Sequence, residues 1–505
     1  YDYVIKNGKI VDGTGNPWYK ADVGIKGDRI VKIGNISLGE GNKIIDAAGK
    51  IVCPGFIDMH SHAERQMLQD PAVHNMITQG NTTIIGGNCG GSQLDLDRFF
   101  KAVERKGSSI NMGSLIGHNT IRSRVMRNEG REPTDEELEE MKRYVEKGMQ
   151  DGALGFSTGL KYRPGVYSKM EEVIELAKVA AGYGGFYATH LRDEGLKLFE
   201  SMDEAIRIGE EAGIPVQLSH HKAAGADMWG QTVNSLKKME EARERGIDVT
   251  TDLHPYPATF TTAAILFPAW ALEGSAEDIN ARMSDPETKK KIVDGIVYNI
   301  IHDRGGNDIK NVTVAVHPAD RSLEGMNLHE ILVKKGRATT MEDAAELLIE
   351  LLLTDGGTSC AYHCLSMDDI VRILQHPLSM YGSDAGNAFM DVGKVHPRHY
   401  GHFPRIIAQH VRERGDLKLE YAIKKMTSFP AQKAGIRDRG QISEGKFADI
   451  VIFDYDKIQD KATFIDPHQY CEGIDYVMVN GDIVVDHGEL TGKLPGKVIY
   501  GPGKK

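Results

Sequence analysis

The sequence of 505 residues has no long apolar run and no concentrated stretch of basic residues. No segment reaches the roughly 18–20 consecutive apolar residues that cross a bilayer, so we expect no membrane partner. The first residues, Tyr1–Lys6, show no basic region followed by an apolar core, which argues against secretion by that route. The net charge is −11 and the triplet Lys289–Lys291 is short, so we do not expect nucleic acid as a partner.

Cysteine is also scarce. Five cysteines are spread over the chain, at positions 53, 89, 360, 364 and 471. This spacing is not that of a disulfide scaffold, and it predicts reduced thiols in a cytoplasmic protein. Cys360 and Cys364 flank His363, but the second ligand pair of a zinc knuckle is missing, so we interpret this cluster as structural.

The two ends of the chain have the same pattern of predicted strands and turns. Short alternating strands with Asn-Gly and Gly-Asp turns occupy residues 1–54, and the same style returns in residues 431–505. Each segment alone is too short to bury a core, so we predict that the two pair into one small β-sandwich. A chain of this length exceeds one hydrophobic core, which also favours two or three domains.

Residues 55–430 alternate predicted strands with predicted helices. Helical stretches are expected at 171–181, 202–212 and 233–245, between strands that end near residues 190, 220 and 252. Repeated βα units of this length predict an α/β fold, a closed parallel (β/α)8 barrel of the TIM type. Residues 265–355 interrupt this alternation of strands and helices. We expect them to form an insertion or lid, with an isolated strand at 312–316.

The motif His60-Ser61-His62 closes an apolar run that begins at Ile51 and reads as a buried strand. Side chains alternate across a strand, so both imidazoles project to the same side and form a candidate pair of metal ligands. More polar residues follow later predicted strands, namely Cys89, His190, His220 and Asp384. In a parallel barrel these strand ends share one face, and this mixture of nitrogen, sulfur and one carboxylate favours zinc.

Several blocks of sequence resemble the amidohydrolase superfamily and, within it, the N-acyl-D-amino-acid deacylases, or D-aminoacylases. The segment Pro54–His62 is similar to the first metal motif of the superfamily. Blocks similar to the deacylase branch lie at residues 87–90, 189–194, 219–222, 382–384, 396–401, 425–428 and 439–451.

The resemblance implies a zinc enzyme that hydrolyses N-acyl-D-amino acids, small-molecule substrates, to a carboxylate and a free D-amino acid. It implies that Cys89, His190 and His220 hold one tightly bound zinc ion, with Cys89 in the bridging role. His60, His62 and Asp384 would form a weaker second site. Zinc lowers the pKa of a water to around 7, and Asp384 would act as general base and then as general acid.

The resemblance also implies the substrate-binding residues. Tyr256 and Thr262 would bind the α-carboxylate, although the family often has Ser at the second place. Tyr162 matches a tyrosine near the scissile carbonyl. The residues themselves add two cations, because Lys222 follows His220 by two positions and Arg398 could form a bidentate clamp.

Two alternatives remain open at this point. A cyclic amidohydrolase acting on hydantoin-, dihydropyrimidine- or dihydroorotate-like rings would typically carry a bridging lysine, and Cys89 argues against it. A non-catalytic scaffold of the same fold would usually have lost ligands, whereas every expected ligand is present. Phe389 and Met390 in a predicted loop hint at an apolar substrate side chain, with an acidic or broad preference left open. The sequence does not determine the oligomeric state.

Overall fold

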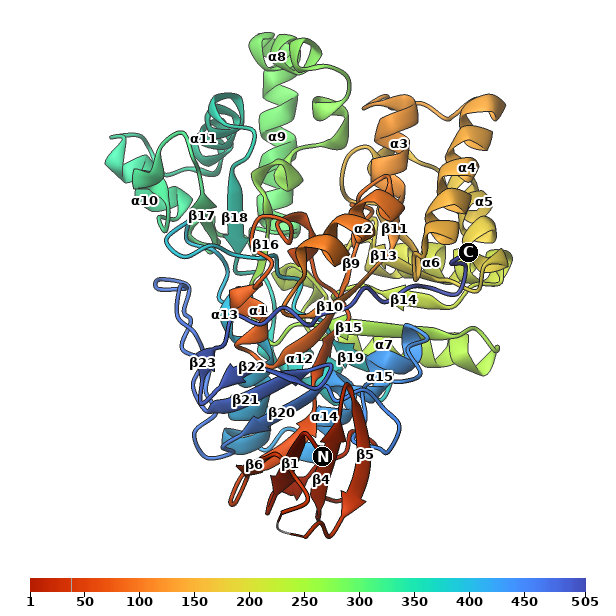
Figure 1. The fold of residues 1–505 in the computed structure, drawn as a ribbon. Coiled ribbons are helices and arrows are strands. Elements are labelled where there is room, and N and C mark those ends of the chain that lie inside the picture. The colour runs from red at the N-terminus through yellow and green to blue at the C-terminus, as the bar shows by residue number, and fades with distance from the viewer. Residues whose placement is uncertain (38) are drawn as a thin grey trace.

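The computed structural model describes residues 1–37 and 39–505. An N-terminal sheet of four strands lies at the lower end of the view in Figure 1, in the order β5-β4-β1-β6. Its strands are β1 (Tyr3–Lys6), β4 (Asp22–Lys26), β5 (Arg29–Gly34) and β6 (Lys43–Asp46). No helix among the described residues is long and apolar enough to cross a membrane.

A second sheet contains strands from both ends of the chain, in the order β23-β22-β21-β20-β7-β2-β3. Its N-terminal strands are β2 (Lys9–Ile10), β3 (Tyr19–Lys20) and β7 (Ile51–Pro54). Its C-terminal strands are β20 (Ile450–Phe453), β21 (Ile474–Val479), β22 (Asp482–Asp486) and β23 (Glu489–Leu490). β7 and β20 are antiparallel, with Cys53 opposite Val451, and buried side chains of both sheets form one apolar cluster.

Parallel strands follow one another along the middle of the chain. The first sheet has the order β10-β9-β8 and the second has the order β11-β12-β13-β14-β15-β19. Their strands are β8 (Phe56–Asp58), β9 (Asn81–Gly86), β10 (Asn111–Ser114), β11 (Ile116–Gly117), β12 (Gly155–Gly159), β13 (Phe186–His190), β14 (Val216–Leu218), β15 (Val249–Leu253) and β19 (Ser379–Tyr381). Nearly every residue in them is buried, as expected for parallel strands that are covered on both faces.

The last and first of these strands are linked just beyond their carboxyl ends. The Asp384 amide donates to the His60 carbonyl at 2.7 Å, and the His62 amide donates to the Ala385 carbonyl at 2.8 Å. One residue, Leu115, separates β10 from β11, and its amide donates to the Gly86 carbonyl. The Leu154 amide, just before β12, donates to the Ser114 carbonyl of β10 at 2.8 Å, so backbone hydrogen bonds join the two parallel sheets at both edges.

Helices connect these strands and surround them (Figure 1). They are α1 (His74–Ile77), α2 (Leu96–Lys106), α3 (His118–Met126), α4 (Asp135–Asp151), α5 (Met170–Gly182), α6 (Leu198–Ala212), α7 (Thr232–Glu244), α12 (Met367–Gln375), α13 (Arg398–Arg405), α14 (Leu419–Met426) and α15 (Ser428–Lys433). The predicted stretches 171–181 and 202–212 lie within α5 and α6, and the stretch 233–245 extends one residue beyond the end of α7. Thr134 begins α4 with a capping box, in which its hydroxyl accepts from the Glu137 amide while Glu137 accepts from the Thr134 amide.

A group of elements between β15 and β19 lies at the opposite end of the molecule from the N-terminal sheet (Figure 1). Its helices are α8 (Ala276–Ser284), α9 (Pro286–His302), α10 (Leu328–Lys334) and α11 (Met341–Thr354). An antiparallel sheet of β16 (Thr259–Thr262), β18 (Ser359–Tyr362) and β17 (Val312–Val316) accompanies them. β17 coincides with the isolated strand predicted at 312–316.

Candidate metal centre

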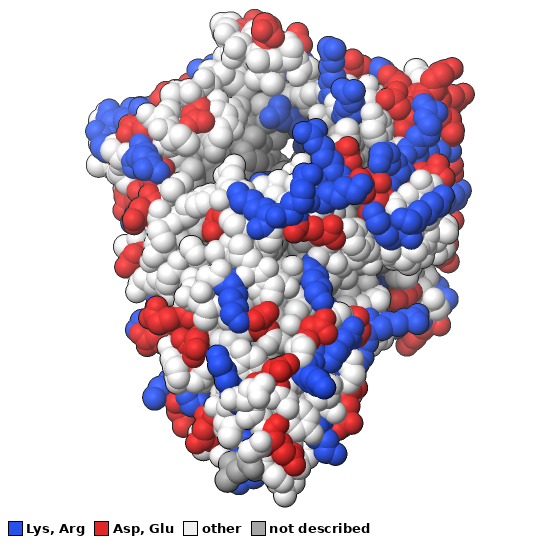
Figure 2. All heavy atoms as spheres, viewed as in Figure 1, with Lys and Arg blue, Asp and Glu red and all other residues white. Residues whose placement is uncertain are grey.

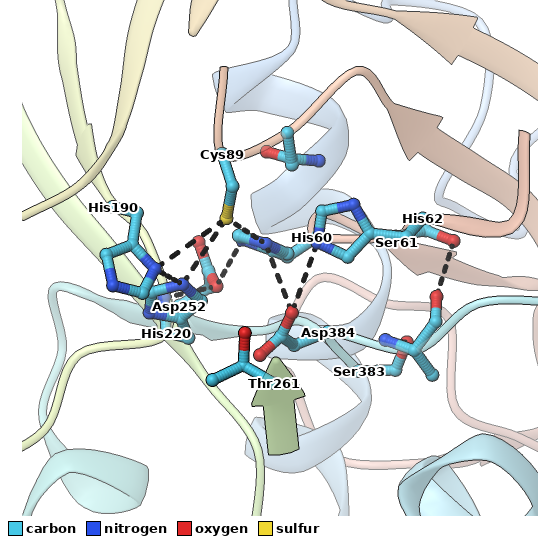
Figure 3. Close-up of polar contacts among 12 residues, drawn as sticks. His60, Ser61, His62, Cys89, His190, His220, Asp252, Thr261, Ser383 and Asp384 are labelled. Carbon is cyan, nitrogen blue, oxygen red and sulfur yellow. Dashed lines mark hydrogen bonds and ion pairs between the residues drawn. The ribbon is translucent and has the colours of Figure 1, made fainter. Parts of the chain in front are cut away.

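The six candidate ligands lie together at the carboxyl ends of the parallel strands (Figure 3). His190 is the last residue of β13, and the others follow β8, β9, β14 and β19 within four residues. Carboxyl ends of parallel strands meet at one edge, which explains why positions far apart in sequence converge. The other candidate ligands are His60, His62, Cys89, His220 and Asp384.

A sulfur atom and three imidazoles define the first part of the cluster. The Cys89 Sγ lies 3.4 Å from His60 Nε2, 3.5 Å from His220 Nε2 and 3.9 Å from His190 Nδ1. The two nitrogens of His190 and His220 that face Cys89 are 2.8 Å apart. Cys89, His190 and His220 therefore present one soft and two nitrogen donors to a common point.

Asp384 defines the second part of the cluster. Its Oδ1 lies 3.3 Å from His62 Nε2 and 3.6 Å from His60 Nε2, and its Oδ2 lies 2.9 Å from Arg398 Nη1. His60 faces both Cys89 and Asp384. The two parts of the cluster are therefore adjacent and share one imidazole.

The electrostatics of the cluster favour an ionised thiol and an ionised carboxyl. Burial alone would raise the pKa of Cys89, but the charges of His60 and His220 hold it well below its usual range. Burial likewise opposes ionisation of Asp384, yet the Arg398 guanidinium holds the pKa of that carboxyl well below its usual range. Burial lowers the pKa of His190 to about 4, so this imidazole is neutral. These are the protonation states that metal ions require.

His60 and His220 differ from His190 because their pKa values are raised. Burial would lower the pKa of both, but nearby anions outweigh it, chiefly Cys89 and Asp252 for His60 and Glu194 for His220. Protons on these imidazoles thus balance the negative charge of the cluster. A divalent cation would supply the same balance.

Three of the candidate ligands adopt an unusual backbone conformation. The φ angles of Cys89, His220 and Asp384 are 53°, 37° and 53°, in the left-handed region that non-glycine residues rarely occupy. Such strain of about 1–3 kcal/mol per residue concentrates at functional sites. Each of these side chains follows a strand end, where the turn directs it toward the cluster.

Two buried carboxylates behind the histidines were not predicted from the sequence. Asp252 Oδ1 lies 3.3 Å from His60 Nδ1 and accepts from the His220 amide at 2.8 Å. Glu194 contacts His190 Nε2 at 3.4 Å and His220 Nδ1 at 3.1 Å. The sequence offered a signal for both, because Asp252 ends a predicted strand and Glu194 closes the block 189–194 that resembles the deacylase branch.

A cleft of about 500 Å³ opens over the cluster. Tyr162, Thr262 and Arg398 line it, as does Thr261, whose hydroxyl lies 3.0 Å from the Tyr162 hydroxyl. The Tyr162 ring packs beside His190 with 4.6 Å between ring centroids. Three predicted substrate-binding residues are therefore at the cleft, together with Thr261, which was not predicted.

Lys222 and Tyr256 lie elsewhere, which differs from their predicted position at the substrate mouth. The Lys222 ammonium is buried behind the cluster, 2.7 Å from both Glu194 Oε1 and His220 Nδ1. The buried Tyr256 ring packs edge-on against His396, with Arg405 over its face. Neither residue lines the cleft. The sequence placed both residues near the right strands but could not show which side chains would pack against them.

Cationic side chains line the cleft, and the apolar side chains of the predicted loop do not. Arg65 and Arg163 line it together with Arg398, whereas Phe389 and Met390 do not. Figure 2 shows the face hollowed below α8 and α9, with Lys and Arg side chains beside the hollow.

Parallel strands with a cluster of thiol, imidazole and carboxyl groups at their carboxyl ends define an α/β protein with a candidate metal centre. A profile described as the Amidohydrolase family matches residues 43–294 and 346–485. The chain belongs to the amidohydrolase family, and the resemblance drawn from its sequence motifs is confirmed.

Similar proteins cover almost the whole chain. An N-acyl-D-glutamate deacylase and a D-aminoacylase, both of Alcaligenes xylosoxydans xylosoxydans, are 32% and 31% identical to it over 99% of this chain and 96% and 97% of their own lengths. A solved structure of the N-acyl-D-glutamate deacylase of Bordetella bronchiseptica, complexed with zinc and a phosphonate mimic of the tetrahedral intermediate, superimposes with a TM-score of 0.84. That match has 30% identity and covers 99% of both chains.

Proposed function

We propose that this protein is a zinc-dependent N-acyl-D-amino-acid deacylase, which hydrolyses a linear amide to a carboxylate and a free D-amino acid. The observation that carries the proposal is the convergence of Cys89, His190 and His220 beneath a cleft that Arg398 lines. The names of the full-length relatives support the same reaction.

We also propose a domain organisation that places this site. Residues 55–430 form a closed (β/α)8 barrel with an insertion at about 265–355, and residues 1–54 and 431–505 form a small β-sandwich. The hydrogen bonds between the ends of β8 and β19 support closure of the barrel. The pairing of β7 with β20 supports one domain built from both chain ends.

The donors of the cluster fit zinc. Thiolate sulfur and imidazole nitrogen are the usual protein donors to zinc, whereas magnesium and calcium prefer oxygen. Cys89, His190 and His220 would hold the tight ion, and His60, His62 and Asp384 would form the weaker site. When bound, zinc supplies a Lewis acid for the carbonyl and lowers the pKa of a water molecule.

The remaining chemistry falls to side chains at the cleft. Asp384 is half-buried, ionised and placed between the imidazoles and the cleft, so it would take the proton of the attacking water. The same carboxyl would then deliver that proton to the departing amine. Arg398 would bind the substrate α-carboxylate, and the Tyr162 hydroxyl would donate to the scissile carbonyl oxygen.

The charge of the cleft indicates the substrate side chain. One cation suffices to bind an α-carboxylate. Arg398, which lies beside Asp384, would supply that cation. Arg65 and Arg163 are two further cations on the lining, which favours a second carboxylate on the substrate. Acidic D-amino acids are therefore the proposed class, in place of the apolar side chain suggested by Phe389 and Met390.

A substrate panel tests the proposal. N-acetyl derivatives of D- and L-glutamate, aspartate, leucine and methionine, with hydantoin, would be assayed while zinc content is measured on the same preparations. We expect turnover of the D-enantiomers, highest for the acidic pair. Ring opening of hydantoin without deacylation would contradict the proposed reaction, and faster turnover of the apolar substrates would contradict only the proposed side-chain class.

A further inference from the structure

One carboxylate lies behind both histidines of the Cys89 cluster. Glu194 Oε2 is 3.4 Å from His190 Nε2, and Glu194 Oε1 is 3.1 Å from His220 Nδ1. The opposite nitrogens of the same two rings face Cys89. Glu194 is thus placed to set both rings at once, although it does not face Cys89 or the cleft.

Two buried cations hold Glu194 in place. Lys222 Nζ lies 2.7 Å from Oε1, and the Arg304 guanidinium pairs with Oε2. The side chains of Glu194, Arg304 and Lys222 are 1%, 2% and 6% exposed. A buried carboxylate needs such partners, because a charge that is buried without enough compensation strongly destabilises the folded protein.

Arg304 comes from the segment between α9 and β17, far in sequence from Glu194. The family match leaves out residues 295–345, so this arginine lies outside the part of the chain that the family profile covers. Its neighbour Asp303 pairs with Lys161 at 2.8 Å, just beyond β12. Two adjacent residues of the insertion therefore reach buried charges next to the metal centre.

Glu194 and Lys222 impose different roles on the outer ring nitrogens. A carboxylate only accepts, so Glu194 favours N–H on His190 Nε2, which leaves the lone pair toward Cys89 free. At His220 Nδ1 the Glu194 carboxylate is 3.1 Å away and the Lys222 ammonium is 2.7 Å away, so an acceptor and a donor compete for the same nitrogen.

We propose that Glu194, held by Arg304 of the insertion, is a positioning residue that fixes the orientation of His190 and His220 for metal binding and favours the His190 tautomer whose lone pair faces Cys89. The proposal rests on the proposed metal centre. It assigns the insertion a part in metal retention beyond shaping the substrate cleft.

Zinc affinity of the purified full-length protein tests this inference, measured by competition with a chromophoric chelator at pH 7. We expect Glu194→Gln and Arg304→Met to bind zinc about 10–100-fold more weakly than wild type. Arg304→Lys keeps a positive charge and should recover part of the loss. Arg337→Met is the matched control, because it removes an exposed ion pair with Glu350 in the same insertion and should leave zinc affinity unchanged.

A double variant separates positioning from a general effect on packing. If Arg304 acts through Glu194, Glu194→Gln combined with Arg304→Met should bind zinc no more weakly than Glu194→Gln alone. Additive losses would overturn this route. Wild-type zinc affinity in folded Arg304→Met, even with a lower melting temperature of the metal-free protein, would overturn the proposal and leave Arg304 a structural residue.

The comparison of Arg304→Met with Arg304→Lys decides the matter should Glu194→Gln fail to fold. Chelator competition needs no substrate, so a failed deacylase assay would count against the proposed function and not against this inference. Conversely, if both substitutions leave the zinc affinity unchanged and the enzyme is active, the proposed function stands and this inference is wrong.

Discussion

At the scale of single residues, the candidate ligands divide by how the backbone holds them. His190 belongs to the regular strand β13, whereas Cys89, His220 and Asp384 sit in left-handed turns after their strands. A turn of this kind directs a side chain sideways, and neighbouring hydrogen bonds must compensate its cost. For His220 the compensation is visible, because its amide donates to Asp252.

Cys89→Ala should abolish tight zinc binding and nearly all turnover, since it removes the sulfur donor shared by three imidazoles. Asp384→Asn should keep zinc at the Cys89 site and lower the turnover number by about 10²–10⁴-fold, the usual contribution of a general base. Elemental analysis beside the deacylase assay measures both. Cys471→Ala is the control, because that thiol only donates to the Thr78 carbonyl. Full zinc content in Cys89→Ala would remove it from the ligand set.

The convergence of the candidate ligands could be predicted from the sequence, because it depends on where the strands end. His60 and His62 lie just beyond the end of β8, so the meeting of parallel strand ends at one edge, and not alternation within a strand, brings them to the cluster. The surroundings were not predictable in this way. Lys222 and Tyr256 are buried by contacts with Glu194 and His396, and the sequence does not encode such contacts as a spacing.

At the scale of elements, helix ends show how strongly local sequence determines the fold. The Thr-x-x-Glu pattern at residues 134–137 forms the capping box of α4, where Thr134 and Glu137 exchange hydrogen bonds. The connections between β15 and β19 follow no such rule. β16 pairs with β18 almost a hundred residues later, so its path depends on distant contacts that a periodic pattern cannot reveal.

Thr134→Ala should lower the free energy of unfolding by about 1 kcal/mol, because the Glu137 amide loses its acceptor. The midpoint of urea denaturation measures this change. Thr339→Ala, at an exposed position that begins no helix, should shift the midpoint by much less. Equal midpoints for Thr134→Ala and wild type would mean that the capping box contributes little to α4.

At the scale of the whole molecule, the sheet that contains β7 and β20 ties the two ends of the chain together. Val52 from one end and Ile452 from the other lie opposite each other and share a buried cluster. The segment after β23 continues past β10 to α4, where the Lys505 amide donates to the Gln150 carbonyl. The two ends therefore flank the candidate ligands in sequence and pack against each other in space.

Ile452→Ala should lower the free energy of unfolding by about 2–5 kcal/mol, the usual cost of a cavity at a buried isoleucine. Because the cluster includes both ends, limited proteolysis should then cut both terminal segments more readily. Ile465→Ala, at a side chain that is 85% exposed, is the control. Faster cleavage of the C-terminal segment alone would contradict a single domain built from both ends.

The pairing of β7 with β20 also has a consequence for biosynthesis. The partner of β7 emerges from the ribosome roughly 400 residues later, which at roughly 5–20 residues per second means a delay of about 20–80 s. During this interval an apolar strand edge next to His60 has no partner and is open to association with other nascent chains. Chaperone demand during synthesis should therefore concentrate on the first sixty residues.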